Sequence, residues 1–341
     1  MSRDKLIFVG IGLLALLGFL VFKQAKRDEA LGAPLASTQE LPTLAMPVGV
    51  DKISITNGAK GEVVLERVPD SAGASPDGGV GTIWQVVKPV KAKAGQQAVN
   101  DLVSNLQEIK ADAPINLKLD DAVRKDKQLD AEHGVRVVAW KDGEKKVDEI
   151  FGKSGPAGQL VVLADKPDQV WAAKGYSAYL YTKDAKDFRD KEILKFDDAN
   201  ATQVTIVNAH GTLSFTKGDS KWVATKDKAP LTRFDEEKLK DMLRAFKSLN
   251  ADDFGDGKSV PETGLDKPAA RLVVQLKDNA GIHSLLVGGV ANGTNRWAKR
   301  PDDDTLYQIG SYTSEWVLAD PSKFQQPVDA GAGDAAAAKK K

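Results

Sequence analysis

An internal repeat constrains the fold of this chain more than any other feature of its sequence. The same succession of patterns occurs twice: an alternating hairpin, a strand that contains a tryptophan, a proline and an amphipathic helix. The first hairpin covers residues 52–67 and the second covers 203–216. Self-similarity of this kind indicates one structural unit used more than once. The shared markers are Trp84 and Trp222, then Pro89 and Pro230.

The two predicted helices have the same hydrophobic spacing. Their apolar positions step by 3, 1, 3 and 3 residues, which places them on one face of a helix with 3.6 residues per turn. Thr232 and Asp235 each offer an N-cap for the second helix. The apolar positions are Val99, Leu102, Val103, Leu106 and Ile109 in the first copy, and Leu239, Met242, Leu243, Phe246 and Leu249 in the second.

The second halves of the copies match at a constant offset of 136 residues, including the strand 135–143 with the strand 271–279. Short strands joined by tight turns, with few crossover helices, favour an antiparallel α+β fold over a doubly wound sheet. We therefore predict two tandem α+β repeat domains, 51–196 and 197–325, each a mostly antiparallel sheet with packed helices. Other matched pairs are Leu129 with Leu265, Gly152 with Gly288, Tyr176 with Tyr312 and Phe188 with Phe324.

Seventeen consecutive residues near the N-terminus, 6–22, carry neither a charge nor a polar side chain. As a helix this run covers about 25 Å, and flanking basic side chains can reach outward to span a bilayer core of about 30 Å. A cleaved signal peptide shares this layout, but the strongly charged segment after the run and Pro34 disfavour cleavage. We expect residues 1–22 to be an uncleaved transmembrane signal anchor.

The segments outside the repeats predict how the chain is placed in a cell. Residues 23–50 are predicted to be a linker and residues 326–341 a disordered Ala/Gly/Lys tail. Basic residues on the two sides of the apolar run nearly balance, but long domains are translocated largely regardless of charge. We expect a single-pass protein of the inner (cytoplasmic) membrane, with the bulk of the chain on the periplasmic, extracytoplasmic side.

Composition excludes several classes of function. Lys plus Arg and Asp plus Glu both number 48, so the formal net charge is zero and no field gathers nucleic acid. The chain has no cysteine, which excludes disulfides, thiolate metal sites and cysteine nucleophiles. We expect no nucleic-acid partner.

The three histidines and one Gly-Asp-Ser motif are the candidates for catalytic residues. His133, His210 and His283 each lie in one copy without a histidine at the matching place in the other, which is typical of turn or surface residues. Residues 218–220 (Gly-Asp-Ser) resemble a hydrolase nucleophile motif, but they lie in a predicted turn before Trp222. The sequence therefore predicts no catalytic residue, and we expect the protein not to be an enzyme.

Two acidic stretches and two tryptophans are the candidates for binding sites. Residues 250–257 resemble a calcium loop, but the required ligand positions fall on Phe254 and Thr263. Residues 302–304 are predicted to form a polar hairpin tip. Trp84 and Trp222 could stack on sugars, but their equivalent places in the repeat favour core positions. We predict no metal site and no cofactor.

With the repeat laid out, the chain resembles a bacterial family of unknown function, domain family four-three-four-zero. The residues that carry the resemblance are Trp84, Pro89, the helix 99–109, Leu129-Asp130, Gly152 and the stretch 188–194. The second copy keeps the family's Gly-Leu-Asp-x-Pro at 264–268, whereas the first has Gln128 in place of the glycine and Glu132 in place of the proline. Genes of this family tend to lie beside those of gliding-motility-type ABC transporters, so the resemblance implies an accessory role and no particular chemistry.

Three hypotheses for the function remain. The favoured one is a membrane-anchored extracytoplasmic binding or scaffold protein, accessory to an ABC-type transporter complex. Its partners would be transporter membrane subunits or auxiliary proteins, with the membrane contacted through residues 6–22 and the segment 189–200 between the copies as the docking region. The alternative is a module that binds an envelope polymer such as cell-wall glycan, and a hydrolase is the least favoured.

Overall fold

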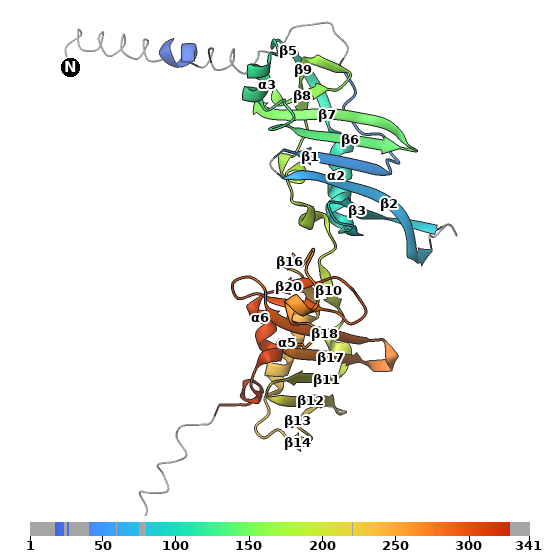
Figure 1. Cartoon of the computed structure of the whole chain (residues 1–341), viewed down its shortest axis with the longest axis vertical. Helices are drawn as coiled ribbons and strands as arrows, with labels where there is room; N and C mark the ends of the chain where they lie inside the picture. The colour runs from blue at the N-terminus through green and yellow to red at the C-terminus, as the bar shows by residue number, and fades with distance from the viewer. Residues whose placement is uncertain are drawn as a thin grey trace, which may run out of the picture. The chain divides into compact units, whose positions relative to one another are not determined.

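The computed structural model describes residues 18–23, 26, 41–58, 60–74, 80–219 and 221–327. The chain divides into two compact units between Asp190 and Lys191, here called unit 1 and unit 2. Each unit contains a large sheet with helices packed on it (Figure 1). All pairings among the described strands are antiparallel, so the predicted mostly antiparallel α+β class is confirmed.

Unit 1 is built on a nine-stranded sheet of order β4-β3-β2-β1-β6-β7-β8-β9-β5. Its helix α2 (Gln96–Glu108) buries Val99, Leu102 and Leu106 in the core of the unit. The short helices are α3 (Asp121–Lys127), α4 (Ala178–Tyr181) and η1 (Ala185–Phe188). The strands are β1 (Lys52–Asn57), β2 (Gly61–Ala74), β3 (Val80–Lys88), β4 (Ala92–Lys93), β5 (Lys110–Ile115), β6 (Val135–Lys141), β7 (Glu144–Gly155), β8 (Gly158–Leu163) and β9 (Lys166–Lys174).

Unit 2 has a nine-stranded sheet of order β14-β13-β12-β11-β17-β18-β19-β20-β16. Helix α5 (Glu236–Phe246) begins at Asp235, whose side chain accepts a hydrogen bond from Glu237 N, as one of the predicted N-caps requires. The other helices are η2 (Asp198–Asn200), η3 (Pro261–Thr263), η4 (Lys277–Asn279), α6 (Ser311–Leu318) and η5 (Pro321–Phe324). The strands are β11 (Ala201–Asn208), β12 (Gly211–Lys217), β13 (Trp222–Lys226), β14 (Ala229–Pro230), β16 (Asp253–Phe254), β17 (Ala270–Leu276), β18 (Ile282–Val290), β19 (Arg296–Lys299) and β20 (Tyr307–Ile309); β10 (Glu192–Lys195) pairs with β15 (Ser248–Asn250) in a small separate sheet.

The two large sheets have the same strand order when their strands are matched in chain order. A hydrogen bond of the matched tryptophans also recurs in the two units. Trp84 N donates to Gln96 Oε1 at 2.9 Å, and Trp222 N donates to Glu236 Oε2 at 3.3 Å, so each tryptophan is tied to the first turn of the following helix. Both tryptophans are buried, which confirms that they are core residues.

Two glycines occupy the same tight place in the two units. A Cβ atom at Gly152 would collide with the carbonyl oxygen of Lys127, and one at Gly288 would collide with that of Thr263. Since any larger side chain would force the strand away from the preceding turn, this close approach explains the Gly at both positions.

The predicted offset of 136 residues is wrong for one strand. In β6, Val135 pairs with Phe151, and in β17, Ala270 pairs with Val287, so the strands correspond at an offset of 135. An offset of 136 would match the buried Val137 with Val273, which is only half-buried, because a slip of one residue exchanges the two faces of a strand.

Part of the predicted linker belongs to unit 1. Leu44, Met46 and Val50 are buried in its core, and Met46 N donates to Leu106 O at 2.9 Å near the end of α2. Unit 2 has a similar contact, in which Phe196, the residue after β10, donates its N–H to Lys247 O at 3.0 Å after α5. Residues 41–50 are therefore a lead-in segment of the unit, because their apolar side chains cover the end of its helix.

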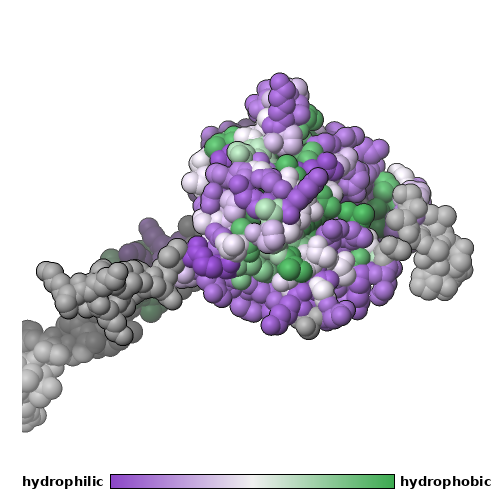
Figure 2. All heavy atoms as spheres, turned by 90° about the horizontal axis from the view of Figure 1, so that it is seen from below, coloured by the Kyte–Doolittle hydropathy of each residue, from purple (hydrophilic) through white to green (hydrophobic). Residues whose placement is uncertain are grey.

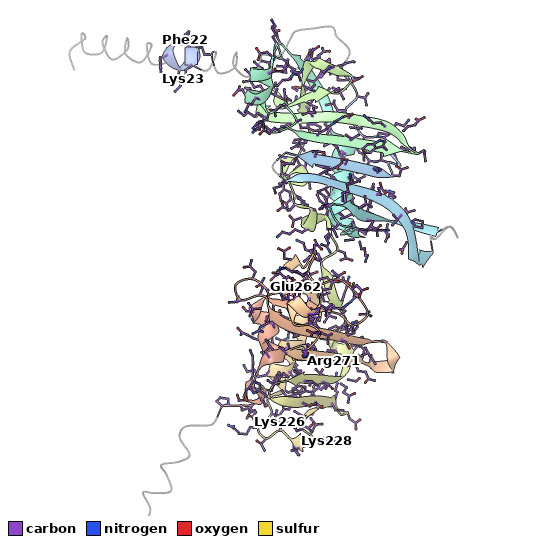
Figure 3. The ribbon with its side chains drawn as sticks, viewed as in Figure 1. Phe22, Lys23, Lys226, Lys228, Glu262 and Arg271 are labelled. Carbon is purple, nitrogen blue, oxygen red and sulfur yellow. The ribbon has the colours of Figure 1, made fainter. Side chains whose placement is uncertain are left out.

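Most of the predicted anchor, 1–17, and most of the linker and tail lie outside the described residues. Within the described part of the chain, no helix has the length and apolar character needed to cross a membrane. Residues 18–23 are helical, and Phe22 and Lys23 lie on this short segment (Figure 3). On the face of the molecule in Figure 2, hydrophilic side chains predominate and hydrophobic ones form only small areas.

Candidate functional site

The most unusual side chain in the described structure is Glu149, which lies on β7 of unit 1. Side chains alternate between the two faces of a strand, so Val147, Glu149 and Phe151 all point into the core. Glu149 is only 2% exposed. A glutamate is almost never buried to this extent unless it is paired.

Unit 2 has a leucine at the corresponding position. Glu149 pairs with Val137 across β6 and β7, and Leu285 pairs with Leu272 across β17 and β18. Leu285 is fully buried in the core of unit 2. The fold therefore does not require a polar side chain at this position.

The carboxyl group of Glu149 is held in its neutral form. Its Oε2 atom is buried and has no hydrogen-bond partner among the described residues. Burial raises the pKa of Glu149 to about 8, and the neighbouring carboxylate of Asp148 adds to the rise. At neutral pH Glu149 is consequently protonated in the folded protein.

Asp148, the residue before Glu149, points to the opposite face of the strand and is ionised. Burial alone would raise the pKa of Asp148, but hydrogen bonds from Arg136 and Lys145 lower it overall. Arg136 Nε and Nη2 lie 2.8 and 2.9 Å from its two oxygens, and Lys145 Nζ lies 2.7 Å away. Two adjacent carboxyl groups thus have pKa values moved in opposite directions, a pattern that is common at functional sites.

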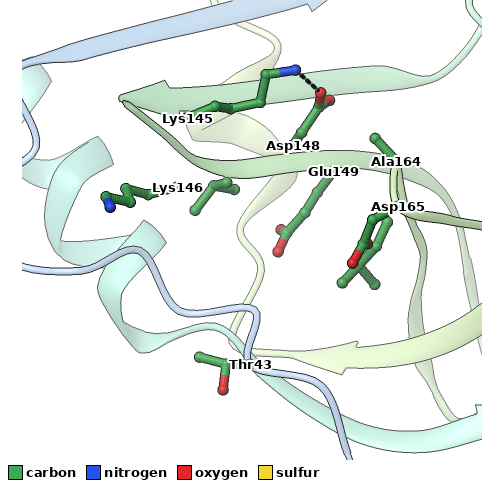
Figure 4. A pocket seen from close by; sticks show the side chains of 9 residues that line it. Thr43, Lys145, Lys146, Asp148, Glu149, Ala164 and Asp165 are labelled. Atoms are coloured by element: carbon green, nitrogen blue, oxygen red, sulfur yellow. Dashed lines mark hydrogen bonds and ion pairs between the residues drawn. The ribbon is translucent and has the colours of Figure 1, made fainter. Parts of the chain in front are cut away.

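Glu149 lines a pocket of about 530 Å³, here called the Glu149 pocket. Its wall comes from the start of β7, the end of β8 and Thr43 of the lead-in segment (Figure 4). Glu149 points toward Thr43, whereas Lys145 turns to the other side of the strand and contacts Asp148. A pocket of this size is within the range of small-molecule sites. The lining residues are Thr43, Lys145 to Glu149, and Leu163 to Asp165.

The corresponding corner of unit 2 is filled by larger side chains. The ring of Phe196, the residue after β10, lies 5.2 Å from that of His283, which occupies the place of Val147. Arg300, which follows β19, donates to Ile193 O at 3.4 Å. The pocket in unit 1 therefore results from smaller or polar residues at positions that unit 2 packs.

A second pocket of unit 1, about 370 Å³, is lined by His133, Tyr176 and Phe151 among others. His133 Nδ1 lies 2.9 Å from Asp130 Oδ1, and the ligand atoms of Asp130, Glu132 and His133 lie within 4.8 Å of one another. Asp130 also accepts hydrogen bonds from the backbone of Glu132 and His133. These bonds are those of a capped turn, so the group is explained without a metal ion.

The other two histidines lie in different settings. His210 is exposed in the turn between β11 and β12, with Nδ1 3.6 Å from Asp320 Oδ2. His283 is half-buried on β18, and burial lowers its pKa, with Arg300 adding to the effect. Among the described residues, neither imidazole ring forms a hydrogen bond with a serine or threonine.

The motif residues also lie in turns and short strands. Gly218 N donates to Lys221 O at 2.8 Å in the turn after β12, and Ser220 lies outside the described residues. Within the predicted calcium-like stretch, 253–254 form β16 and pair with β20. In the loop 302–304, burial alone would raise the pKa of Asp303, but a hydrogen bond from Tyr307 lowers it overall.

The sequence prediction missed Glu149. A usable signal was present, because the offset of 136 matches Glu149 with Leu285 on an inward-facing position. A glutamate in one copy and a leucine in the other at a core position identifies a buried ionisable group without a structure.

The described residues thus define an α+β protein with two large antiparallel sheets and a polar pocket in unit 1. A family model described as "Domain of unknown function (DUF4340)" matches residues 84–268, from Trp84 in β3 to the residue two before β17. The match covers more than half of the chain, and the chain belongs to this family. No curated protein and no solved structure matches the chain.

Proposed function

We propose that this protein is a membrane-anchored, extracytoplasmic binding or scaffold protein that acts beside an ABC-type transporter and has no catalytic activity of its own. In this proposal its two units are tandem copies of one α+β fold. The identical strand order of the two large sheets supports the repeat. The recurring contact of Trp84 and Trp222 with the following helix supports it further.

The observation that carries the membrane proposal is the exposure of apolar side chains on the helical residues 18–23. Phe19, Leu20, Val21 and Phe22 are 54–64% exposed, and they continue the apolar run that starts at Leu6. Consecutive large apolar side chains are costly to leave in water, whereas a bilayer accommodates them on every side of a helix.

The proposed binding role rests on the layout of charge. Most charged side chains of the described surface are paired in ion pairs of mixed sign, such as Lys52 with Glu66 and Lys93 with Asp190. This surface has no single-sign field for nucleic acid, and it is suited to a protein partner in contact with both signs of charge.

A role in binding glycan is less well supported. Trp84 and Trp222, the aromatic residues on which it depends, are 2% and 8% exposed and therefore cannot stack on a sugar.

Membrane attachment and topology can be tested with the full chain. The protein should stay in the membrane pellet after carbonate washing, and its N-terminus should be residue 1 or 2. Alkaline phosphatase fused after residue 325 should be active, because the body is proposed to be extracytoplasmic. A mature N-terminus near residue 34, or an inactive fusion, would overturn the proposal.

A further inference from the structure

We propose that the Glu149 pocket binds a small organic cation through a primary ammonium group, with Glu149 as its counter-ion. The pocket, the buried oxygen without a partner and the leucine at the corresponding place in unit 2 together support a ligand site. The inference does not depend on the transporter proposal, since every lining residue belongs to unit 1.

The burial of Glu149 destabilises the folded state when no ligand is bound. A buried polar atom without a partner destabilises a fold, and the leucine of unit 2 shows a side chain that avoids this cost. A costly side chain at a core position that also borders a pocket is typical of a residue kept for binding.

The charged side chains of the pocket determine the sign of the charge on the ligand. Both lysines of the pocket already have carboxylate partners: Lys145 contacts Asp148, and Lys146 contacts Glu144. Figure 4 shows Lys146 extending away from Glu149. Asp165, which also lines the pocket, forms no ion pair with another described residue. Glu149 and Asp165 are therefore the carboxyl groups of the pocket that have no cationic partner among the described residues. A cationic ligand would complement them.

An organic ammonium ion fits the pocket better than a bare metal ion does. An ammonium group has three donors, and one of them can satisfy Glu149 Oε2. The pocket holds more than one or two atoms, so the ligand is an organic amine rather than a bare ion.

Binding must be linked to loss of a proton from Glu149. The titratable groups around this carboxyl are Asp148, whose charge acts on it from the other face of the same strand, and Tyr181 of α4. Lys146 and Asp165 line the same pocket. Burial gives Glu149 itself a pKa of about 8. An ammonium ligand favours its ionised form, so affinity should rise about tenfold from pH 6 to pH 7 and less than about twofold from pH 8 to pH 9.

The test is calorimetric titration of the full chain in mild detergent with ethanolamine, putrescine and spermidine. At least one amine should bind with release of about 0.9 proton at pH 7, measured in two buffers of different ionisation enthalpy. Ethylene glycol, which has a hydroxyl in place of the amine of ethanolamine, should not compete.

Two variants separate the pocket from the rest of the chain. Glu149→Gln keeps the shape of the protonated side chain and should abolish both binding and proton release. Glu315→Gln removes an exposed charge on α6 of unit 2 and should leave both unchanged. Failure of all three amines, binding that persists in Glu149→Gln, or affinity that falls from pH 6 to pH 8 overturns the proposal. The last result would indicate an anion that accepts a hydrogen bond from protonated Glu149.

Discussion

Glu149 in unit 1 and Leu285 in unit 2 occupy the same place on equivalent strands, and both are buried. One position in the same fold thus holds a carboxyl group in one unit and an alkyl group in the other. The pair provides an internal comparison in which the cost of the polar group can be measured.

Replacing Glu149 with leucine should stabilise unit 1. The substitution removes an unsatisfied buried oxygen and restores the side chain of the other unit, so the free energy of unfolding should rise by about 1–3 kcal/mol. The reverse change in unit 2, Leu285→Glu, should destabilise by at least as much. Urea unfolding of both variants measures the effects, and a destabilised Glu149→Leu would contradict our account of the pocket.

Glu149 should also make the stability of unit 1 depend on pH. The pKa of Glu149 is about 8 in the folded state, against 4.5 for a glutamate in the unfolded chain, so unfolding releases a proton between these two pH values. The stability that the neutral carboxyl contributes is complete below pH 4.5 and is lost as pH rises toward 8, by a total on the order of 5 kcal/mol. Asp148, whose pKa is lowered, acts only in the more acidic range.

The urea midpoint of unit 1 should therefore fall from pH 5 to pH 8 in the native protein and change much less in Glu149→Gln. Equal slopes in the two proteins would show that Glu149 is not the titrating group.

The amphipathic helices should contribute equally to the two cores. Leu106 of α2 and Phe246 of α5 are both fully buried, so truncation to alanine removes apolar contact and leaves a cavity. Each substitution should cost about 2–5 kcal/mol in chemical denaturation. Val48→Ala, at an exposed position, is the control and should change little.

Replacing Gln128 with glycine should stabilise unit 1. It has a left-handed backbone with φ of 57°, and its counterpart Gly264 has φ of 70°. Side chains disfavour this region, so Gln128→Gly should stabilise unit 1 by up to about 1 kcal/mol and Gly264→Ala should destabilise unit 2. Thermal melts of the two variants should shift in opposite directions; a shift in the same direction would show that the turns are not equivalent.

Much of the fold was predictable because the repeat doubles the information in the sequence. The burial of Leu106, Phe246 and both tryptophans follows from a pattern that two copies share. The register of β6 was not predictable. Unit 1 has one more residue than unit 2 before this strand and one fewer after it, so the matches on both sides of the strand keep the offset of 136. Only the alternation of buried side chains in the folded sheet decides the offset.

The pocket was less predictable than the core. Glu149 could be found by comparing the copies, but its pocket also depends on Thr43, from a segment predicted to be a linker. The lead-in residues Leu44 and Met46 are buried through contacts with a helix more than fifty residues later, and no local pattern predicts such contacts.

We propose that the protein is tethered in the membrane beside an ABC-type transporter. Affinity purification of the full chain in gentle detergent, followed by mass spectrometry, tests it most directly. We predict that transporter membrane subunits are recovered, and that a variant without residues 1–22 recovers at least about tenfold less because it is no longer colocalised with them. Recovery of no transporter subunit, together with specific retention of the protein on purified cell-wall glycan, would contradict the claim.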